Sequence, residues 1–211
     1  MLTAIIDYSS GNLHSARKAF EKISASNNLG SVVVTSNPDI ISSADRLVLP
    51  GDGAFPACKT ELLSSEAYDA MIYAAVEKGR PFLGICVGMQ LMAIKGYEYE
   101  ETDGLGWIDG EVCKIDPTDD NLKIPHMGWN TLNIEREHPI LKGIFNGDHV
   151  YFVHSFQMVV SNLKQRLAYT DYGTDITAVV GNGNLLGFQF HPEKSAQIGL
   201  KMIENFLSWS P

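Results

Sequence analysis

One uncharged run, Pro81 to Ile94 (PFLGICVGMQLMAI), constrains the fold of this chain more than any other segment. Residues 82 to 85 are mainly apolar and predict a short buried strand, whereas residues 87 to 94 predict a helix. Cys86 stands at the junction between the two. The run therefore predicts a strand that turns directly into a helix, with a thiol at the turn.

Two glycines flank this cysteine at mirrored positions, Gly84 before it and Gly88 after it. Bulky residues there would clash with a sharply reversing backbone, whereas glycine has no Cβ to collide. The turn would expose the Cys86 thiol above the free N–H groups of a helix start, which favour the thiolate. The alternative is a buried cysteine that only fills the core. A catalytic role for Cys86 therefore requires a base, an acid and an oxyanion pocket elsewhere in the chain.

Length and charge limit the classes of protein to consider. The 211 residues, 45% of them hydrophobic, suffice for one sizeable core, which predicts a single domain over residues 1–211. The net charge of −9 argues against a nucleic-acid partner. The start lacks the pattern of a secretory signal, and no uncharged run reaches the ~20 residues of a membrane span, so we expect a cytoplasmic protein that binds no membrane. Three cysteines without a C-x-x-C pair disfavour disulfides and a metal site.

The first half of the chain alternates strand and helix patterns. Strands are predicted at residues 4–6, 32–35, 47–49 and 82–85, helices at 13–23 and 87–94, and a long helical region at 58–78. This alternation is typical of an α/β fold with an open, mostly parallel sheet flanked by helices.

The second half changes character, because short β-like runs separated by turn residues replace the helical patterns. These runs are residues 111–115, 131–134, 150–153, 167–170, 177–180 and 185–190. Asn182-Gly183 between the last two is a strong hairpin signal, which predicts an antiparallel β extension of the sheet. Residues 116–121 predict a polar loop, and an amphipathic helix over residues 198–207 closes the chain.

A candidate base follows the last predicted strand, in the segment His191-Pro192-Glu193. Glu193 is placed to accept a hydrogen bond from the imidazole, which would fix its tautomer and support the imidazolium formed when Cys86 loses its proton. A single histidine at a strand end is also common as an ordinary surface or core residue, so the pairing with Cys86 must be spatial.

A candidate oxyanion loop, Pro50-Gly51-Asp52-Gly53, follows another buried strand. Gly51 and Gly53 allow backbone N–H groups to turn toward a ligand, so the loop and the amide of Val87 are candidates to bind an oxyanion. Alone, the segment is equally typical of an ordinary turn after a strand.

Taken together, GICVGMQ around Cys86, the PGDG loop and HPEKS from His191 resemble the class I glutamine amidotransferases, which release ammonia from glutamine with a Cys-His-Glu triad. The resemblance implies that Cys86 is the nucleophile, His191 the general base and acid, and Glu193 its orienting acid. It also implies that Gln90 contributes to glutamine binding and that the chemistry requires no cofactor or metal.

Four segments narrow the resemblance further: DYSSGN, PGDGAF, PHMGWN and YFVHSF. They are similar to the glutaminase subunits of imidazole glycerol phosphate synthase, from histidine biosynthesis, and the likeness covers nearly the whole chain. It implies a heterodimer with a (β/α)8-barrel cyclase subunit that receives the ammonia. It also implies that Val153, His154 and Ser155 line the glutamine site, with His154 as a positioning residue, and that Asn12 faces the partner.

Met127 and Trp129 predict an interface on physical grounds as well. Methionine and aromatic side chains left in solvent around Gly128 would mark an interface, which the resemblance assigns to the cyclase subunit. The alternative is an internal lid that covers the core.

The sequence thus predicts a glutaminase in which Cys86 forms a glutamyl thioester. Two alternatives remain open. Another cysteine hydrolase on an α/β-hydrolase-like sheet is one, although that fold places its acid before the histidine, whereas Glu193 follows His191. A non-catalytic regulatory subunit of the same fold is the other, and the intact Cys86, His191 and Glu193 set argues against it.

Overall fold

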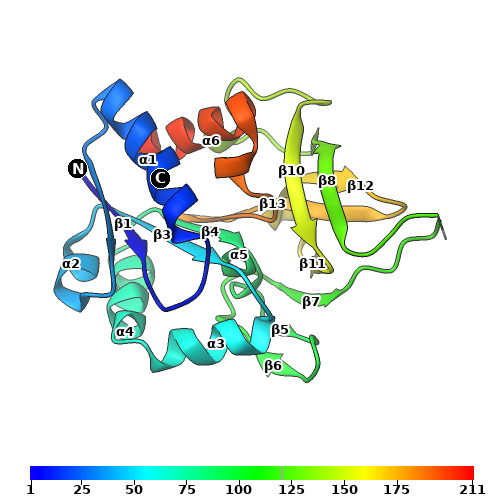
Figure 1. Ribbon diagram of the computed structural model, residues 1–211, viewed down its shortest axis with the longest axis horizontal. Coiled ribbons are helices and arrows are strands. Elements are labelled where there is room, and N and C mark those ends of the chain that lie inside the picture. The colour runs from blue at the N-terminus through cyan, green and yellow to red at the C-terminus, as the bar shows by residue number, and fades with distance from the viewer. Residues whose placement is uncertain (120) are drawn as a thin grey trace.

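The computed structural model describes residues 1–119 and 121–211 as an α/β protein (Figure 1). Its main sheet contains eight strands: β1 (Leu2–Ile6), β2 (Ser31–Thr35), β3 (Arg46–Gly51), β4 (Phe82–Cys86), β9 (Asn133–Ile134), β12 (Arg166–Asp171), β13 (Asp175–Asn182) and β14 (Leu185–Phe188). Their order in space is β2-β1-β3-β4-β14-β13-β12-β9. The first five strands of this order pair in parallel and the last three are antiparallel, which confirms the predicted fold class.

Two smaller sheets stand beside the antiparallel end of the main sheet (Figure 1). One is the pair β8 (His126–Thr131) and β10 (His149–His154). The other has the order β11-β7-β5-β6 and consists of β5 (Lys95–Gly96), β6 (Thr102–Asp103), β7 (Gly110–Lys114) and β11 (Phe156–Val160). The sequence patterns predicted several of these strands but not their separation into sheets of their own.

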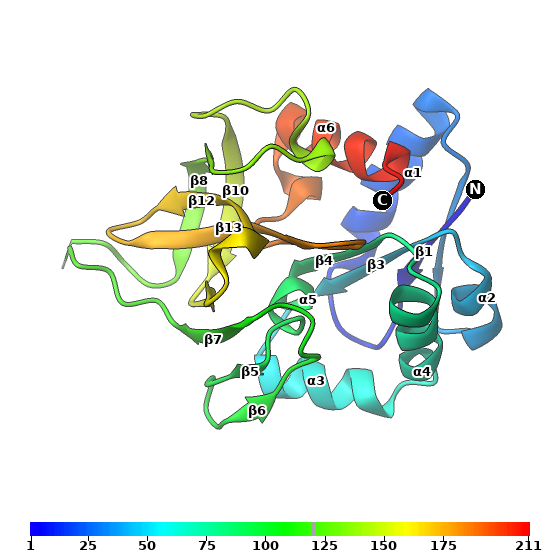
Figure 2. The ribbon, with the colours of Figure 1, turned by 180° about the vertical axis from the view of Figure 1, so that it is seen from behind.

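Helices cover both faces of the parallel part of the main sheet (Figures 1 and 2). The α-helices of the described residues are α1 (Leu13–Asn27), α2 (Pro38–Ser43), α3 (Phe55–Ser64), α4 (Ala67–Ile72), α5 (Val87–Gln90) and α6 (Ala196–Ser208). Helices α1 and α6 pack together on one face, where the rings of Phe20 and Phe206 meet edge to face with centroids 6.4 Å apart. Helices α3 and α4 lie on the opposite face.

The central strands β3 and β4 are buried along their whole length. Their nearly continuous apolar runs fit this position, because strands covered on both faces have no solvent side to keep polar. Each fully buried Leu or Ile there contributes about 1.5–3 kcal/mol relative to an exposed one. The functional loops at the ends of these strands therefore rest on a rigid base.

The helical region predicted over residues 58–78 is confirmed, but it is divided into several elements. Helix α3 already begins at Phe55 and ends at Ser64, and Ser65 has the extended conformation φ −79°, ψ 140°. The hydroxyl of Ser65 accepts a hydrogen bond at 3.0 Å from the N–H of Ala67 at the start of α4, and a π-helical turn, Tyr73–Glu77, follows α4. Serine breaks the helix here because its side chain satisfies the backbone of the next one.

The helix predicted over residues 87–94 is also shorter than expected, since α5 ends at Gln90. The N–H group that would extend the helix is used elsewhere: Ile94 N–H donates to the carbonyl of Gly110 at 2.9 Å, whereas a helix through residue 94 needs this group to donate to Gln90. A donor committed to a neighbouring strand cannot also extend the helix. At four residues, α5 has little dipole of its own, so its local N–H groups matter more.

The strand predicted over residues 131–134 is divided between β8 and β9, with Leu132 between them. The PHMGWN segment, for which a lid or an interface is predicted, forms most of β8. Residue 120, within the predicted polar loop at 116–121, lies outside the described residues.

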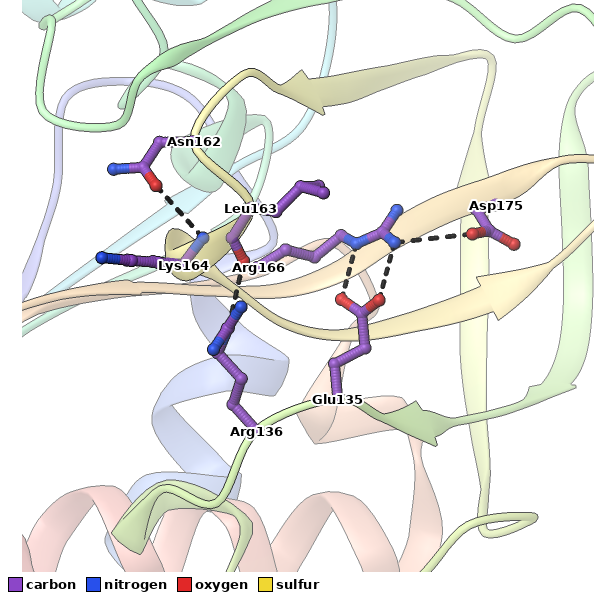
Figure 3. A network of polar contacts seen from close by, with 7 residues as sticks. All are labelled: Glu135, Arg136, Asn162, Leu163, Lys164, Arg166 and Asp175. Carbon is purple, nitrogen blue, oxygen red and sulfur yellow. Dashed lines mark hydrogen bonds and ion pairs between the residues drawn. The ribbon is translucent and has the colours of Figure 1, made fainter.

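An arginine secures the outer edge of the main sheet (Figure 3). Nε and Nη2 of Arg166 on β12 each donate to the Glu135 carboxylate at 2.7 Å, and Nη2 also lies 3.4 Å from Oδ2 of Asp175. Paired hydrogen bonds of this kind match the planar guanidinium to the carboxylate and stabilise one geometry.

Among the described residues, no helix has the length and apolar character to cross a bilayer.

Candidate active site

Three chain segments meet at the carboxyl ends of the central parallel strands. Gly51 at the end of β3 pairs with Cys86 at the end of β4. Strand β14 pairs in parallel with the other side of β4, and His191 follows it closely. Sites in open α/β sheets form at this edge, because the loops that follow neighbouring parallel strands emerge side by side.

Cys86 occupies a strained position at the strand-to-helix turn. Its φ of 55° and ψ of −115° are unusual for a residue with a Cβ. The flanking glycines are required by close approach: a Cβ on Gly84 would lie only 2.5 Å from the carbonyl oxygen of Gly88. The backbone turn therefore holds the thiol at one place at the end of β4.

His191 and Glu193 form a buried pair. Nδ1 of His191 lies 2.8 Å from Oε1 of Glu193, and the two side chains are 4% and 2% exposed. Burial alone would lower the pKa of His191, but its hydrogen bonds with Cys86 and Glu193 and the charges of both groups raise it to about 10. Because Nδ1 faces Glu193, Nε2 is the nitrogen left for Cys86. The arrangement favours a protonated imidazole beside the cysteine sulfur.

A small cavity of about 140 Å³ opens beside the thiol. It is lined by Asp52, Gly53, Cys86, Val87, Gln90, Glu98, Val153, His154, Ser155 and Phe156. Its size suits a ligand much smaller than the drug-sized molecules that occupy pockets of ~300–1,000 Å³. Eight of the residues proposed from the sequence thus share one cavity, although Gly51 is outside its lining and packs against the turn, where a Cβ would lie 2.5 Å from Gly88 N.

Sequence reasoning missed Glu98 and Phe156 as lining residues. Glu98 is brought in by the loop between β5 and β6, and its Oε2 accepts a hydrogen bond at 2.8 Å from the N–H of Phe55. No local pattern around Glu98 predicts this placement, which depends on a contact between distant segments. Phe156 directly follows Val153, His154 and Ser155, which were predicted to line the glutamine site, so its place in the sequence could have indicated that it also lines the cavity.

Hydrogen bonds to the carbonyl of Asp52 hold the loop after β3 in place. The carbonyl of Asp52 accepts hydrogen bonds from Ser10 Oγ at 2.8 Å and Cys58 Sγ at 3.7 Å, while the Asp52 side chain is exposed. Gly53 has φ +126°, a conformation that residues with a Cβ rarely adopt. One peptide of the loop therefore has its carbonyl turned toward Ser10.

Gln90 can offer only an acceptor to a ligand. Its Nε2 donates to the carbonyl of Phe156 at 2.9 Å and to Oε1 of Gln189 at 3.0 Å. Both N–H groups of the amide are therefore used within the protein. Its carbonyl oxygen and the Glu98 carboxylate both suit a cationic group of a ligand.

His154 and His126 form a second buried pair on the wall of the cavity. Nδ1 of His126 lies 3.0 Å from Nε2 of His154, whose Nδ1 lies 2.8 Å from the carbonyl oxygen of Phe156. Burial lowers the pKa of His126 to about 4 and that of His154 to about 3. The alternation of large apolar and polar residues through PHMGWN indicates a strand, but it would place Met127 and Trp129, and not His126, on the buried face.

The residues assigned to a partner surface are not part of the lining of this cavity. Met127 and Trp129 on β8 are 61% and 53% exposed, so the alternative of an internal lid over the core is wrong. Asn12 is half-buried and caps α1, with Oδ1 accepting from the N–H of Ser15 at 3.3 Å. Within residues 1–119 and 121–211, no group of three His, Cys, Asp or Glu side chains is arranged to hold a metal ion.

Residues 4–209 match the family model described as glutamine amidotransferase class-I. The chain belongs to this family of class I glutamine amidotransferases. Over the full length of both chains it is 63% identical to the imidazole glycerol phosphate synthase subunit HisH of Ruegeria pomeroyi and 55% identical to the subunit of the same name from Cereibacter sphaeroides.

Solved structures agree on the fold. One described as a glutamine amidotransferase has a TM-score of 0.70 at 17% identity and covers 97% of this chain and 96% of its own. A glutamine amidotransferase from Thermotoga maritima has a TM-score of 0.62 at 16% identity, with 94% and 78% covered.

Proposed function

We propose that this chain is the glutaminase subunit of imidazole glycerol phosphate synthase and that it releases ammonia from glutamine for a cyclase subunit in histidine biosynthesis. The observation that carries the chemistry is the position of Cys86 on a strained turn beside the buried His191–Glu193 pair, at the edge of a small cavity. The full-length likeness to subunits named HisH supports the assignment to this synthase.

The reaction would begin with the transfer of the Cys86 proton to His191. An ordinary thiol, with a pKa of ~8.5, is only a few per cent ionised at neutral pH, so a partner that takes the proton is needed. The thiolate would attack the side-chain amide carbon of glutamine and form a tetrahedral oxyanion. His191 would then give its proton to the departing nitrogen as the C–N bond breaks, which leaves a glutamyl thioester and ammonia.

The second half would hydrolyse the thioester. Neutral His191 would take a proton from water, and the resulting hydroxide would attack the thioester carbon. When the C–S bond breaks, glutamate leaves and the Cys86 thiolate forms again beside the protonated His191. Glu193 would hold the imidazole in one orientation through both steps, because its carboxylate accepts the Nδ1–H.

The cavity offers groups for the rest of the substrate. Backbone N–H groups at Val87 and in the loop with Gly53 are candidates to stabilise the oxyanion, where each such donor is worth ~10²–10³ in rate. The carbonyl oxygen of Gln90 and the carboxylate of Glu98 suit the α-amino group of glutamine. These roles account for the polar lining without a cofactor.

Ammonia would pass to a (β/α)8-barrel cyclase subunit in a heterodimer. The exposed Met127 and Trp129 give β8 an apolar outer face that fits a protein partner, and Asn12 would join the same interface. The cyclase subunit would incorporate the ammonia to form imidazole glycerol phosphate.

The test is glutamate release from glutamine by this chain together with its cyclase subunit. We expect Cys86→Ala to abolish release, while added ammonium salt still supports product formation by the complex. Cys113→Ala is the matched control, because Cys113 lies on β7 outside the cavity lining and should leave release unchanged. Glutamate release by Cys86→Ala at the wild-type rate would show that the nucleophile is wrongly assigned. Wild-type protein without any release would favour a regulatory subunit.

A further inference from the structure

His126 is a buried histidine with no part in the proposed reaction. Its ring is 2% exposed and is stacked between Phe152, with centroids 4.7 Å apart, and Tyr172, with centroids 4.0 Å apart. Both of its ring nitrogens have polar neighbours: Nδ1 faces His154, and Nε2 lies 3.2 Å from Nδ2 of Asn130. The ring therefore links Asn130 on β8 to the wall of the cavity.

The positions of the protons along this link follow from its two ends. The carbonyl of Phe156 can only accept, so Nδ1 of His154 carries a hydrogen. At the other end, Nδ2 of Asn130 also donates to the carbonyl of Asp171 at 2.9 Å, and Oδ1 of Asn130 accepts from the N–H of Thr131 at 2.8 Å. These two contacts fix the orientation of the amide, which then presents a donor to Nε2 of His126.

With both ends fixed, every contact is satisfied when the two rings are neutral. Nε2 of His126 accepts from Asn130, Nδ1–H of His126 donates to Nε2 of His154, and Nδ1–H of His154 donates to Phe156. Each ring then has one bare nitrogen and one N–H, and no donor meets a donor.

A proton added to His154 would break this order. Nε2–H of His154 would require a bare Nδ1 on His126, which would move the hydrogen of His126 to Nε2 and set it against the N–H of Asn130. Rotation of the Asn130 amide would remove that conflict but would place its oxygen against the carbonyl of Asp171 and its N–H against Thr131. A buried polar contact without its hydrogen bond costs about 1–3 kcal/mol.

We propose that His126 and Asn130 are positioning residues that hold His154 neutral and in one orientation on the wall of the cavity beside Cys86. The inference rests on the proposed glutaminase function of this cavity for its consequence, but not for its geometry. Both nitrogens of His154 are used within the protein, so His154 contributes neither a base nor a charge to the reaction.

A neutral wall matters because His191 must carry a proton during the reaction. The titratable groups that act on His154 are His126 and His191, and each disfavours a positive charge on it. A charge on His154 would equally disfavour the imidazolium of His191, since the repulsion is mutual. His126 and Asn130 would thus protect the state in which His191 alone is charged.

The test uses ¹⁵N NMR of the histidine rings in the isolated wild-type chain near pH 7, without glutamine. Both His126 and His154 should be neutral, with the hydrogen on Nδ1. The variant Asn130→Asp places an acceptor against Nε2 of His126 and should draw one extra proton into the pair, so that one ring gives an imidazolium signal. The matched control Tyr172→Phe keeps the stacking on His126 and loses only the hydrogen bond to Lys123, so its rings should match the wild type.

Turnover gives the second readout. We expect kcat for glutamine in the complex to fall on the order of tenfold or more in Asn130→Asp and to stay within about twofold in Tyr172→Phe, as for a displaced positioning group. A charged ring or an Nε2–H form of either histidine in the wild type would overturn the proposal, and so would two neutral rings in folded Asn130→Asp. The wild-type spectrum decides even if the variant does not fold. An inactive wild type with the expected spectrum would refute the proposed function alone.

Discussion

Nδ1 of His191 lies 2.8 Å from Oε1 of Glu193, and this contact decides which nitrogen of the imidazole is free to face Cys86. The second oxygen of Glu193, Oε2, is buried without a hydrogen-bond partner among the described residues. Because Oε2 has no hydrogen-bond partner, the electrostatic interaction of the Glu193 carboxylate is mainly with its one partner, His191. The pair should therefore control both the charge and the orientation of His191.

Glu193→Gln should lower the pKa of His191 from its value of about 10, because the substitution removes the negative charge that favours the imidazolium. Glutamine turnover in the complex should fall by about 10²-fold or more, since the amide can also present the wrong group to Nδ1. An NMR titration of the His191 ring measures the first effect, and glutamate release measures the second. An unchanged titration would contradict the role assigned to Glu193.

The raised pKa of His191 also predicts how the free energy of unfolding depends on pH. The pKa of His191 is raised from 6.5 to about 10, so the native chain keeps a proton that the unfolded chain loses between these values. Its stabilising contribution is complete below about pH 6.5 and is lost as pH rises through about 10. Urea unfolding across this window should show a steeper loss in the wild type than in Glu193→Gln, and equal slopes would contradict the linkage.

Trp129→Ala should weaken the coupling between the two subunits without affecting the fold. The indole is half exposed on β8 and meets the Tyr151 ring edge to face at a centroid distance of 6.0 Å, so its loss removes contact area for a partner rather than core packing. The measurement is the ratio of glutamate released to imidazole glycerol phosphate formed, which should rise. Phe145→Ala, at an exposed aromatic outside the proposed interface, is the control. A ratio unchanged from the wild type would argue against Trp129 as an interface residue.

Gly53→Ala should slow turnover while leaving glutamine affinity nearly unchanged. A Cβ there would meet only Cys58 Sγ, at an ordinary 3.7 Å, so the cost comes from the φ of +126° and not from a clash. The loop would have to change its backbone and move the N–H groups proposed to stabilise the oxyanion. Gly79→Ala is the control, because it also has positive φ and open space but lies outside the cavity lining. Equal kcat values for the two variants would exclude a special role for the loop.

Arg166→Met should lower the free energy of unfolding by about 1–2 kcal/mol. The Arg166 side chain is only 14% exposed and donates two hydrogen bonds to the Glu135 side chain, which is 29% exposed, so the pair is partly protected from solvent. Arg17→Met is the control: its 3.6 Å pair with Glu21 is about half exposed and should contribute less than about 0.5 kcal/mol. Chemical unfolding measures both changes, and similar values for the two variants would contradict the prediction.

The sequence predicted most of the main sheet because each strand has a local signal. A few neighbouring residues are enough to predict the structure of buried runs such as Leu47 to Leu49 and of the turn at the glycine-flanked Cys86. The helices differ from the prediction for two reasons. The carbonyl of Gly110, from a distant segment, accepts the Ile94 N–H that would extend α5, and local propensity cannot include such competition. The break at Ser65 is local, but apolar periodicity does not reveal it because it depends on a side-chain hydrogen bond with Ala67.

The same division applies to the candidate site. Residues with special backbone or chemistry, such as Cys86, Gly53 and the His191–Glu193 pair, could be chosen from the sequence because their motifs carry the mechanism. Glu98 and His126 could not, because each reaches the site through contacts between segments far apart in the chain. Their roles depend on where a strand or loop is placed.

Strand β8 ties two sets of side chains to one pleated backbone. Met127 and Trp129 point to the outer face, and His126 and Asn130 belong to the face that reaches His154. Side chains alternate along a strand, so a shift of β8 by one residue in its register with β10 would exchange the two faces. Such a shift would turn the indole inward and the imidazole outward at once, so the register of this strand, and not only its composition, positions both the proposed interface and the wall of the cavity.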